Sequence, residues 1–126
     1  GKVIGVDVNQ APTIDKYAAG MTVTSAMKGL AATVKTLLTE LILNDNWEAY
    51  GGSITTLGLV SGTDPEANYV QIPYESTQWA DGFTQDDYKA LVADMFSGAI
   101  TVSNDISAAA ASFGTVMTVN DYGNIK

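Results

Sequence analysis

A short apolar run near the start of the chain constrains the fold more than any other feature. Residues 2–6 are rich in Val and Ile and show little alternation of apolar and polar side chains. This pattern is typical of a strand buried on both faces, as in a parallel sheet. The polar residues 7–10 follow directly. Side chains just beyond the carboxyl end of such a strand lie where open α/β sheets usually bind ligands.

A long amphipathic helix is predicted over residues 25–43. Apolar side chains recur there at three- and four-residue steps, which gives a single apolar stripe. Thr24 or Ser25 would cap its start. The Asn-Asp-Asn segment 44–46 would end it, because Asn tolerates the left-handed conformation.

A second helix is predicted over residues 85–97. Thr84 and Asp87 resemble a capping box at its start, and Gly98 suits the left-handed position at its end. Residues 107–113 fit either a helix or a loop. Further strands are predicted at residues 21–24, 54–60, 68–73, 99–102 and 115–119. The fold class is therefore α/β or α+β, and the opening strand–loop–helix order favours α/β.

The charge balance excludes several kinds of partner. The chain has 14 acidic residues, six lysines and no histidine, for a net charge of −8 over 126 residues. Binding to nucleic acid needs clustered Lys or Arg against the phosphates, and docking on anionic lipid needs a basic patch. We therefore expect neither. No apolar run approaches the roughly 20 residues of a membrane span.

Most familiar catalytic chemistry is also missing from the sequence. Without His or Cys the chain has no His/Cys zinc site, no Ser-His-Asp triad and no Cys nucleophile. No glycine-rich phosphate loop is present, and the acidic pairs at residues 64–66 and 86–87 lack EF-hand spacing. We expect no enzyme activity, no metal and no cofactor.

Four polar residues are candidates for ligand binding. Asp7, Asn9 and Gln10 follow the first strand, although Asx side chains in such a position also form turns. Lys28 falls in the first turn of the long predicted helix, where a cation opposes the helix dipole. Such an unfavourable charge indicates a functional site, or else a side chain that extends into solvent. Trp47 could stack on a ligand or pack against protein, and the same holds for Trp79.

Two segments resemble a known family. Residues 2–10, Lys-Val-Ile-Gly-Val-Asp-Val-Asn-Gln, are similar to the motif V-I-G-V-D-x-D-Q of the basic membrane lipoprotein (BMP) family. Residues 23–28, Val-Thr-Ser-Ala-Met-Lys, resemble the L-T-S-M-x-K segment that follows it. The downstream segments 57–59 and 98–102 resemble the family's Y-G-L and G-x-I-x-V segments. The family comprises substrate-binding proteins of ABC importers, including purine-nucleoside-binding lipoproteins.

The resemblance implies part of a type I periplasmic-binding-protein fold, in which two α/β lobes close over a ligand. It implies one domain over residues 1–126, with a second-lobe strand–helix unit at about 1–50 and a C-terminal segment at 51–126. The first lobe and a lipid-attachment cysteine would precede residue 1, so the protein would be extracytoplasmic, lipid-anchored to the bacterial cell membrane and partnered by an ABC permease. Asp7 would accept hydrogen bonds from the ribose hydroxyls of a purine nucleoside, and Lys28 would contact the same ligand.

Two departures from the family pattern keep other functions open. Asn9 stands where the family often has a second Asp, and residues 60–68 replace a glycine-rich turn. These departures favour, as an alternative, the same fold with a sugar or another small polar metabolite. A sensor or receptor domain built on the same lobe is a further alternative, as is a structural or interaction domain without a ligand. An isolated lobe fragment would expose apolar surface, and we expect it to self-associate.

Overall fold

A pair of parallel strands forms the centre of the structure. The computed structural model describes residues 1–105, 107–109, 112, 120 and 123. Strand β1 (Val3–Asp7) pairs in parallel with β2 (Thr22–Lys28). The short β3 (Val70–Gln71) joins the other side of β2 in the antiparallel direction, giving the order β1-β2-β3. The chain is therefore a mixed α/β structure.

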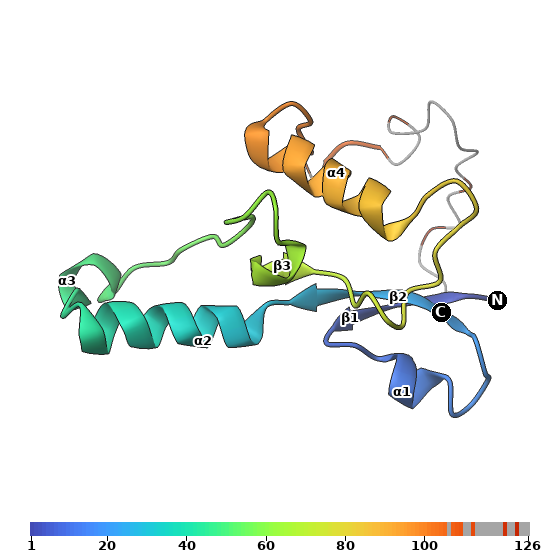
Figure 1. Ribbon diagram of the computed structural model, residues 1–126, viewed down its shortest axis with the longest axis horizontal. Coiled ribbons are helices and arrows are strands. Elements are labelled where there is room, and N and C mark those ends of the chain that lie inside the picture. The colour runs from blue at the N-terminus through green and yellow to red at the C-terminus, as the bar shows by residue number, and fades with distance from the viewer. Residues whose placement is uncertain (106, 110–111, 113–119, 121–122, 124–126) are drawn as a thin grey trace.

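The helices are distributed around and beyond this sheet. Helices α1 and α4 lie on opposite sides of the strands, whereas α2 leads away from the end of β2 (Figure 1). Among the described residues, no helix is both long and apolar enough to cross a membrane. The helical segments are α1 (Ala11–Ile14), α2 (Leu30–Leu38), the π-helical turn η1 (Thr39–Leu43), α3 (Trp47–Tyr50), the 3₁₀ turn η2 (Pro65–Ala67) and α4 (Gln85–Ser97).

The start of the long helix was predicted wrongly. Strand β2 continues to Lys28, and α2 begins only at Leu30, with Gly29 as its N-cap. Ser25 is therefore a strand residue, and its Oγ accepts a hydrogen bond from the Gln10 backbone N–H at 3.1 Å. Pairing with β1 along this stretch overrides the helical spacing of the apolar residues. Consequently Lys28 ends a strand, and the helix-dipole argument does not apply to it.

Burial of β1 on both faces was also predicted wrongly. Only Gly5 is buried in this strand, while the side chains of Ile4 and Val6 are 66% and 57% exposed. The reason is that β1 is an edge strand and α2 does not fold back over the sheet (Figure 1). Of the described Ala, Val, Leu, Ile, Met and aromatic side chains, only Ala11 and Val92 are buried.

Two further predicted strands are not strands in the structure. Residues 54–60 run without a ladder partner: the N–H groups of Val60 and Ser61 donate to Oδ1 of the buried Asn68, at 2.6 and 2.8 Å. This side chain thus takes the place of a neighbouring strand. Residues 99–102 are irregular, and the predicted edge strand 68–73 shrinks to β3. The predicted strand 115–119 lies outside the described residues.

Buried hydrogen bonds, rather than a large apolar core, hold β2 in place. The backbone N–H and hydroxyl of Thr22 both donate to Oδ1 of Asp15 at 2.9 Å, and Thr22 is 1% exposed. These two bonds hold the pKa of the Asp15 carboxyl below its ordinary value. The Gln78 N–H donates to the Val23 carbonyl at 2.7 Å, so the segment before α4 is tied to the same strand. The buried backbone N–H and hydroxyl of Thr22 are thereby satisfied.

Helix α4 confirms its prediction at both ends. It spans Gln85–Ser97, and the Thr84 and Asp87 side chains form the reciprocal capping box. Gly98 follows with φ at 82°, in the left-handed region. All of these signals are local in the sequence, which is why they could be read from it.

The capping box gives α4 an expected dependence on pH. The backbone N–H and the hydroxyl of Thr84 donate to the Asp87 carboxylate at 2.7 Å and hold the pKa of Asp87 below its ordinary 3.8. Such a carboxyl stabilises the folded state above its unfolded pKa, and this stabilisation is lost as the pH falls through the folded pKa. Far-UV circular dichroism should therefore show a larger loss of helicity between about pH 5 and about pH 2 in the wild type than in Asp87→Asn. Identical acid titrations would contradict this role.

Candidate functional site

The structure brings Asp7 and Lys28 together at the carboxyl ends of the two parallel strands. Asp7 ends β1 and Lys28 ends β2, and the two strands run side by side with Asp7 opposite Met27. The Lys28 Nζ lies 2.8 Å from Oδ1 of Asp7, which makes a direct ion pair. The first two sequence motifs, which are separated along the chain, therefore meet at one edge of the sheet.

Asp7 is held in an uncommon backbone conformation. Its φ is 71°, in the left-handed region, and the Val8 N–H donates to the Val6 carbonyl at 2.9 Å, which closes a tight turn around it. Non-glycine residues in this region are sparse, and Asp is among those that tolerate it best. Such conformations gather at functional sites. The turn directs the end of β1 toward the end of β2.

The ion pair is accessible to a ligand. The side chains of Lys28 and Asp7 are 69% and 56% exposed, and exposed pairs of this kind add little to folding stability. The hydrogen bond to Asp7, together with its negative charge, raises the pKa of Lys28 above its ordinary value. Lys28 therefore stays protonated at neutral pH. The pair offers one fixed donor group and one fixed acceptor group to a polar molecule.

A hollow of about 400 Å³ is lined by Lys28, whereas Asp7 lies outside its lining and reaches it through the ion pair. It is formed where β1 and β2 end, where α2 begins and where the chain enters β3. Its polar members are two charged side chains and two carboxamides, a mixture suited to hydroxyl-bearing and amino-bearing ligands. The lining consists of Val8, Asn9, Met27, Lys28, Gly29, Leu30, Ala31, Ala32, Glu66 and Gln71.

The other two candidate residues, Asn9 and Gln10, have structural roles. The Asn9 Oδ1 accepts hydrogen bonds from the Ala11 N–H at 3.2 Å and from the Ser76 hydroxyl at 3.0 Å. Asn9 thus makes the turn that was the alternative interpretation, although it also lines the hollow. Gln10 is the N-cap residue of α1, and its side chain lies against Gly5, away from the hollow's lining.

The remaining candidates lie elsewhere. Trp79 packs in a cluster with Tyr74 and Tyr88, with ring centroids 6.1 and 5.9 Å away, whereas Trp47 is 63% exposed on α3. Burial raises the pKa of the Tyr74 hydroxyl to about 12. Asp64 accepts the Glu66 N–H at the start of η2. Within the described part of the chain, no three His, Cys, Asp or Glu side chains are grouped as metal ligands.

Three other hollows in the described part of the chain lie away from the carboxyl ends of the parallel strands. One of about 590 Å³ runs along the outer face of α2 and η1 and is lined mainly by aliphatic side chains, with Lys35 as its single charged member. Another of about 400 Å³ lies between α2 and residues 50–57, and hydroxyl groups dominate its lining. The third, of about 340 Å³ between α2, η1 and η2, has charges of both signs in its lining, Lys35 and Glu40, but no strand ends there. The edge formed by Asp7 and Lys28 is the candidate site because it lies at the carboxyl ends of two parallel strands.

Sequence reasoning missed two residues of this site. Glu66 was interpreted as part of a loop, and Gln71 as part of an edge strand. Both enter the hollow because β3 pairs with β2 so that Gln71 lies opposite Met27. Only this long-range pairing reveals their position, and no local signal could have done so.

Comparisons with known proteins add no further assignment, since no family model, no curated protein and no solved structure matches this chain.

Proposed function

We propose that this chain is part of the substrate-binding component of an ABC importer and binds a purine nucleoside. The ion pair between Lys28 and Asp7, beside a hollow at the carboxyl ends of two parallel strands, is the observation that carries the proposal. Open α/β sheets bind ligands at this edge. The same two residues occupy the matching positions of the two BMP-like motifs. The protein acts by binding and release, without catalysis.

Each polar group of the edge has a role in this proposal. The Asp7 carboxylate accepts hydrogen bonds from the two vicinal hydroxyls of the ribose, in charge-assisted bonds that are stronger than neutral ones. Lys28, 2.8 Å from Asp7, donates to the ligand beside that carboxylate and balances its charge. Asn9 holds the turn by accepting from the Ala11 N–H, and it accepts from the Ser76 hydroxyl as well. A hollow of about 400 Å³ lies within the size range of small-molecule sites.

The other half of the site belongs to a second lobe in this proposal. The chain is then the C-terminal part of a type I periplasmic-binding-protein fold, and closure of two lobes is a hinge motion coupled to the ligand. The apolar stripe of α2 supports this arrangement, since Leu30, Val34 and Leu38 are each more than half exposed. The remainder of the protein would cover that stripe and supply the aromatic contacts to the base. The lipid anchor, the extracytoplasmic location and the permease partner belong to the same proposal.

The isolated chain is expected to self-associate through this uncovered surface. Ile42 is 72% and Leu43 77% exposed at the far end of the same helical arm, and large exposed apolar patches favour association. Light scattering at increasing concentration should show species larger than the monomer. Leu38→Lys, which places a charge in the stripe, should shift the chain toward the monomer. A wild-type chain that stays monomeric at high concentration would contradict the prediction.

A competition experiment tests the ligand class. The full-length protein that carries this chain is offered adenosine, guanosine and inosine, each in competition with a panel of sugars. Preference for the nucleosides supports the proposal. Preference for a sugar would leave Asp7 and Lys28 as the binding site but replace the nucleoside as its ligand. The absence of ligand-induced stabilisation with every compound would favour a structural or interaction domain.

A further inference from the structure

The lining of the hollow beside Lys28 has a carboxylate-bearing residue of its own, besides the Asp7 that pairs with Lys28 outside this lining. Glu66 lines the hollow from η2, opposite the end of β2, together with Lys28 and the carboxamide of Gln71. Lys28 is already paired with Asp7 at 2.8 Å. One ammonium and two carboxylates leave this edge with a net negative charge, on a chain whose own net charge is −8. An anionic ligand therefore meets repulsion that a neutral ligand does not.

The backbone of Glu66 is fixed, while its side chain is uncommitted. Its N–H donates to Oδ1 of Asp64 at 3.1 Å. The Gln71 side chain donates to the Glu66 carbonyl, and also to the Asn68 carbonyl at 2.7 Å. Across the described residues, no hydrogen bond or ion pair involves the Glu66 carboxylate. The fold thus places this carboxylate at the hollow without using it for stability.

We propose that Glu66 is a specificity-determining residue that makes the site select ligands without negative charge and reject their phosphorylated forms. This inference rests on the proposed function and adds to it a residue from the segment 60–68, which departs from the BMP-like pattern. The Glu66 carboxylate accepts from hydroxyl or amino groups of the ligand and repels a phosphate. Because Glu66 is exposed, the repulsion is screened and should weaken as the salt concentration rises.

The test compares inosine with inosine 5′-monophosphate, which differ by the phosphate alone. Calorimetric titration of the full-length protein should give at least about tenfold tighter binding of inosine at low salt. In Glu66→Gln the ratio of the two dissociation constants, inosine 5′-monophosphate over inosine, should fall by about threefold or more. One unit charge near a ligand changes affinity by about that factor in a well-solvated site. The Glu66 backbone bonds to Asp64 and Gln71 are retained in this variant, so folding is expected to be unchanged.

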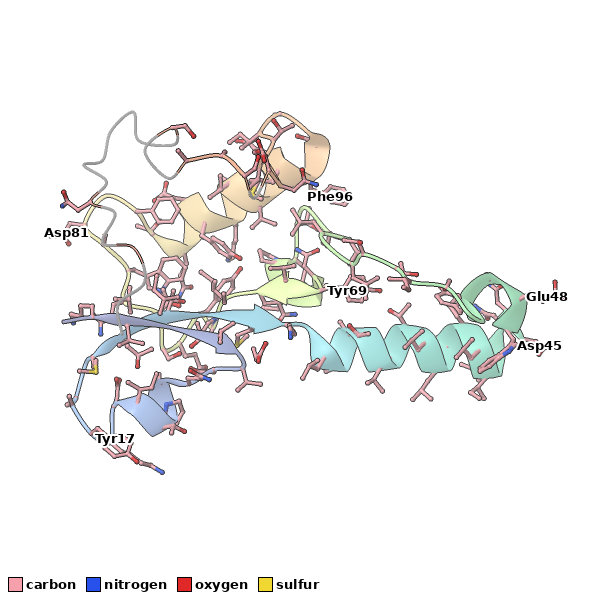
Figure 2. All side chains as sticks on the ribbon, turned by 180° about the vertical axis from the view of Figure 1, so that it is seen from behind. Tyr17, Asp45, Glu48, Tyr69, Asp81 and Phe96 are labelled. Atoms are coloured by element: carbon pink, nitrogen blue, oxygen red, sulfur yellow. The ribbon has the colours of Figure 1, made fainter. Side chains whose placement is uncertain are left out.

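A matched control separates the local charge from the total charge. Glu48→Gln removes one negative charge at the end of the α2–α3 arm, far from the strands (Figure 2). It should leave the preference as in the wild type. An unchanged preference in Glu66→Gln, or equal narrowing in both variants, would overturn the proposal while inosine binding still supports the proposed function. If the wild type bound neither compound, both proposals would be overturned together.

Discussion

Asp7→Asn is expected to weaken nucleoside binding at least about tenfold. Loss of a hydrogen bond to a charged group costs about 1.5–3 kcal/mol, which corresponds to one to two orders of magnitude in Kd. Asn is the informative replacement because Asp7 has a φ of 71°, a conformation that Asn accepts and that would strain Ala. The variant therefore tests the carboxylate without altering the turn. Calorimetric titration of the full-length protein with inosine measures the effect.

Two controls accompany this variant. Glu48→Gln removes the same unit of charge at a distant position and should bind as the wild type does. Lys28→Met should weaken binding as well, since it leaves Asp7 without the cation 2.8 Å away. Unchanged affinity in Asp7→Asn would remove this residue from the site and leave the hollow without its assigned acceptor.

The largest expected effect on stability comes from Gly29→Ala. Gly29 joins β2 to α2, and its N–H donates to the Tyr69 carbonyl at 2.8 Å. An added Cβ would clash with the backbone oxygen of Asn68 and would lie 2.9 Å from the Tyr69 Cα. Backbone atoms cannot rotate away, so β3 would have to move off β2. Overpacking of this kind destabilises by about 1–3 kcal/mol.

Gly58→Ala is the matched control for this substitution. A Cβ at Gly58 would have no neighbour within 4 Å, so its free energy of unfolding should change little. Urea unfolding followed by Trp fluorescence would compare the two variants with the wild type. Equal stability of Gly29→Ala and Gly58→Ala would show that the junction of β2, α2 and β3 is looser than the structure describes.

Local signals explain which parts of the fold could be predicted. The approximate bounds predicted for helix α4 are confirmed because Thr84, Asp87 and Gly98 fix its ends through their own side chains and backbone. The end of β2 could not be predicted in the same way. Residues 25–28 fit a helical pattern, and they stay extended because residues 25–27 pair with β1 and residues 27–28 pair with β3. The Thr-Val-Thr run before them and Gly29 after them were signals of a longer strand.

The candidate site could likewise be predicted only where local sequence signals define it, and not where long-range pairing does. Asp7 and Lys28 could be selected from the sequence because each belongs to a recognisable motif. Their ion pair could not, since Lys28 was assigned to the helix and its place opposite the end of β1 depends on sheet pairing. Glu66 was missed because a loop residue enters the hollow only when Asn68 and Gln71 fix the segment against β2.

Nucleoside binding by this protein can be measured directly. The full-length protein is titrated calorimetrically with adenosine, guanosine and inosine, and the present chain is titrated under the same conditions. We expect binding by the full-length protein and much weaker or no binding by the chain, because the proposed site is completed by a second lobe. Failure of the full-length protein to bind any of the three nucleosides would contradict the assigned ligand and leave Asp7 and Lys28 without their proposed partner.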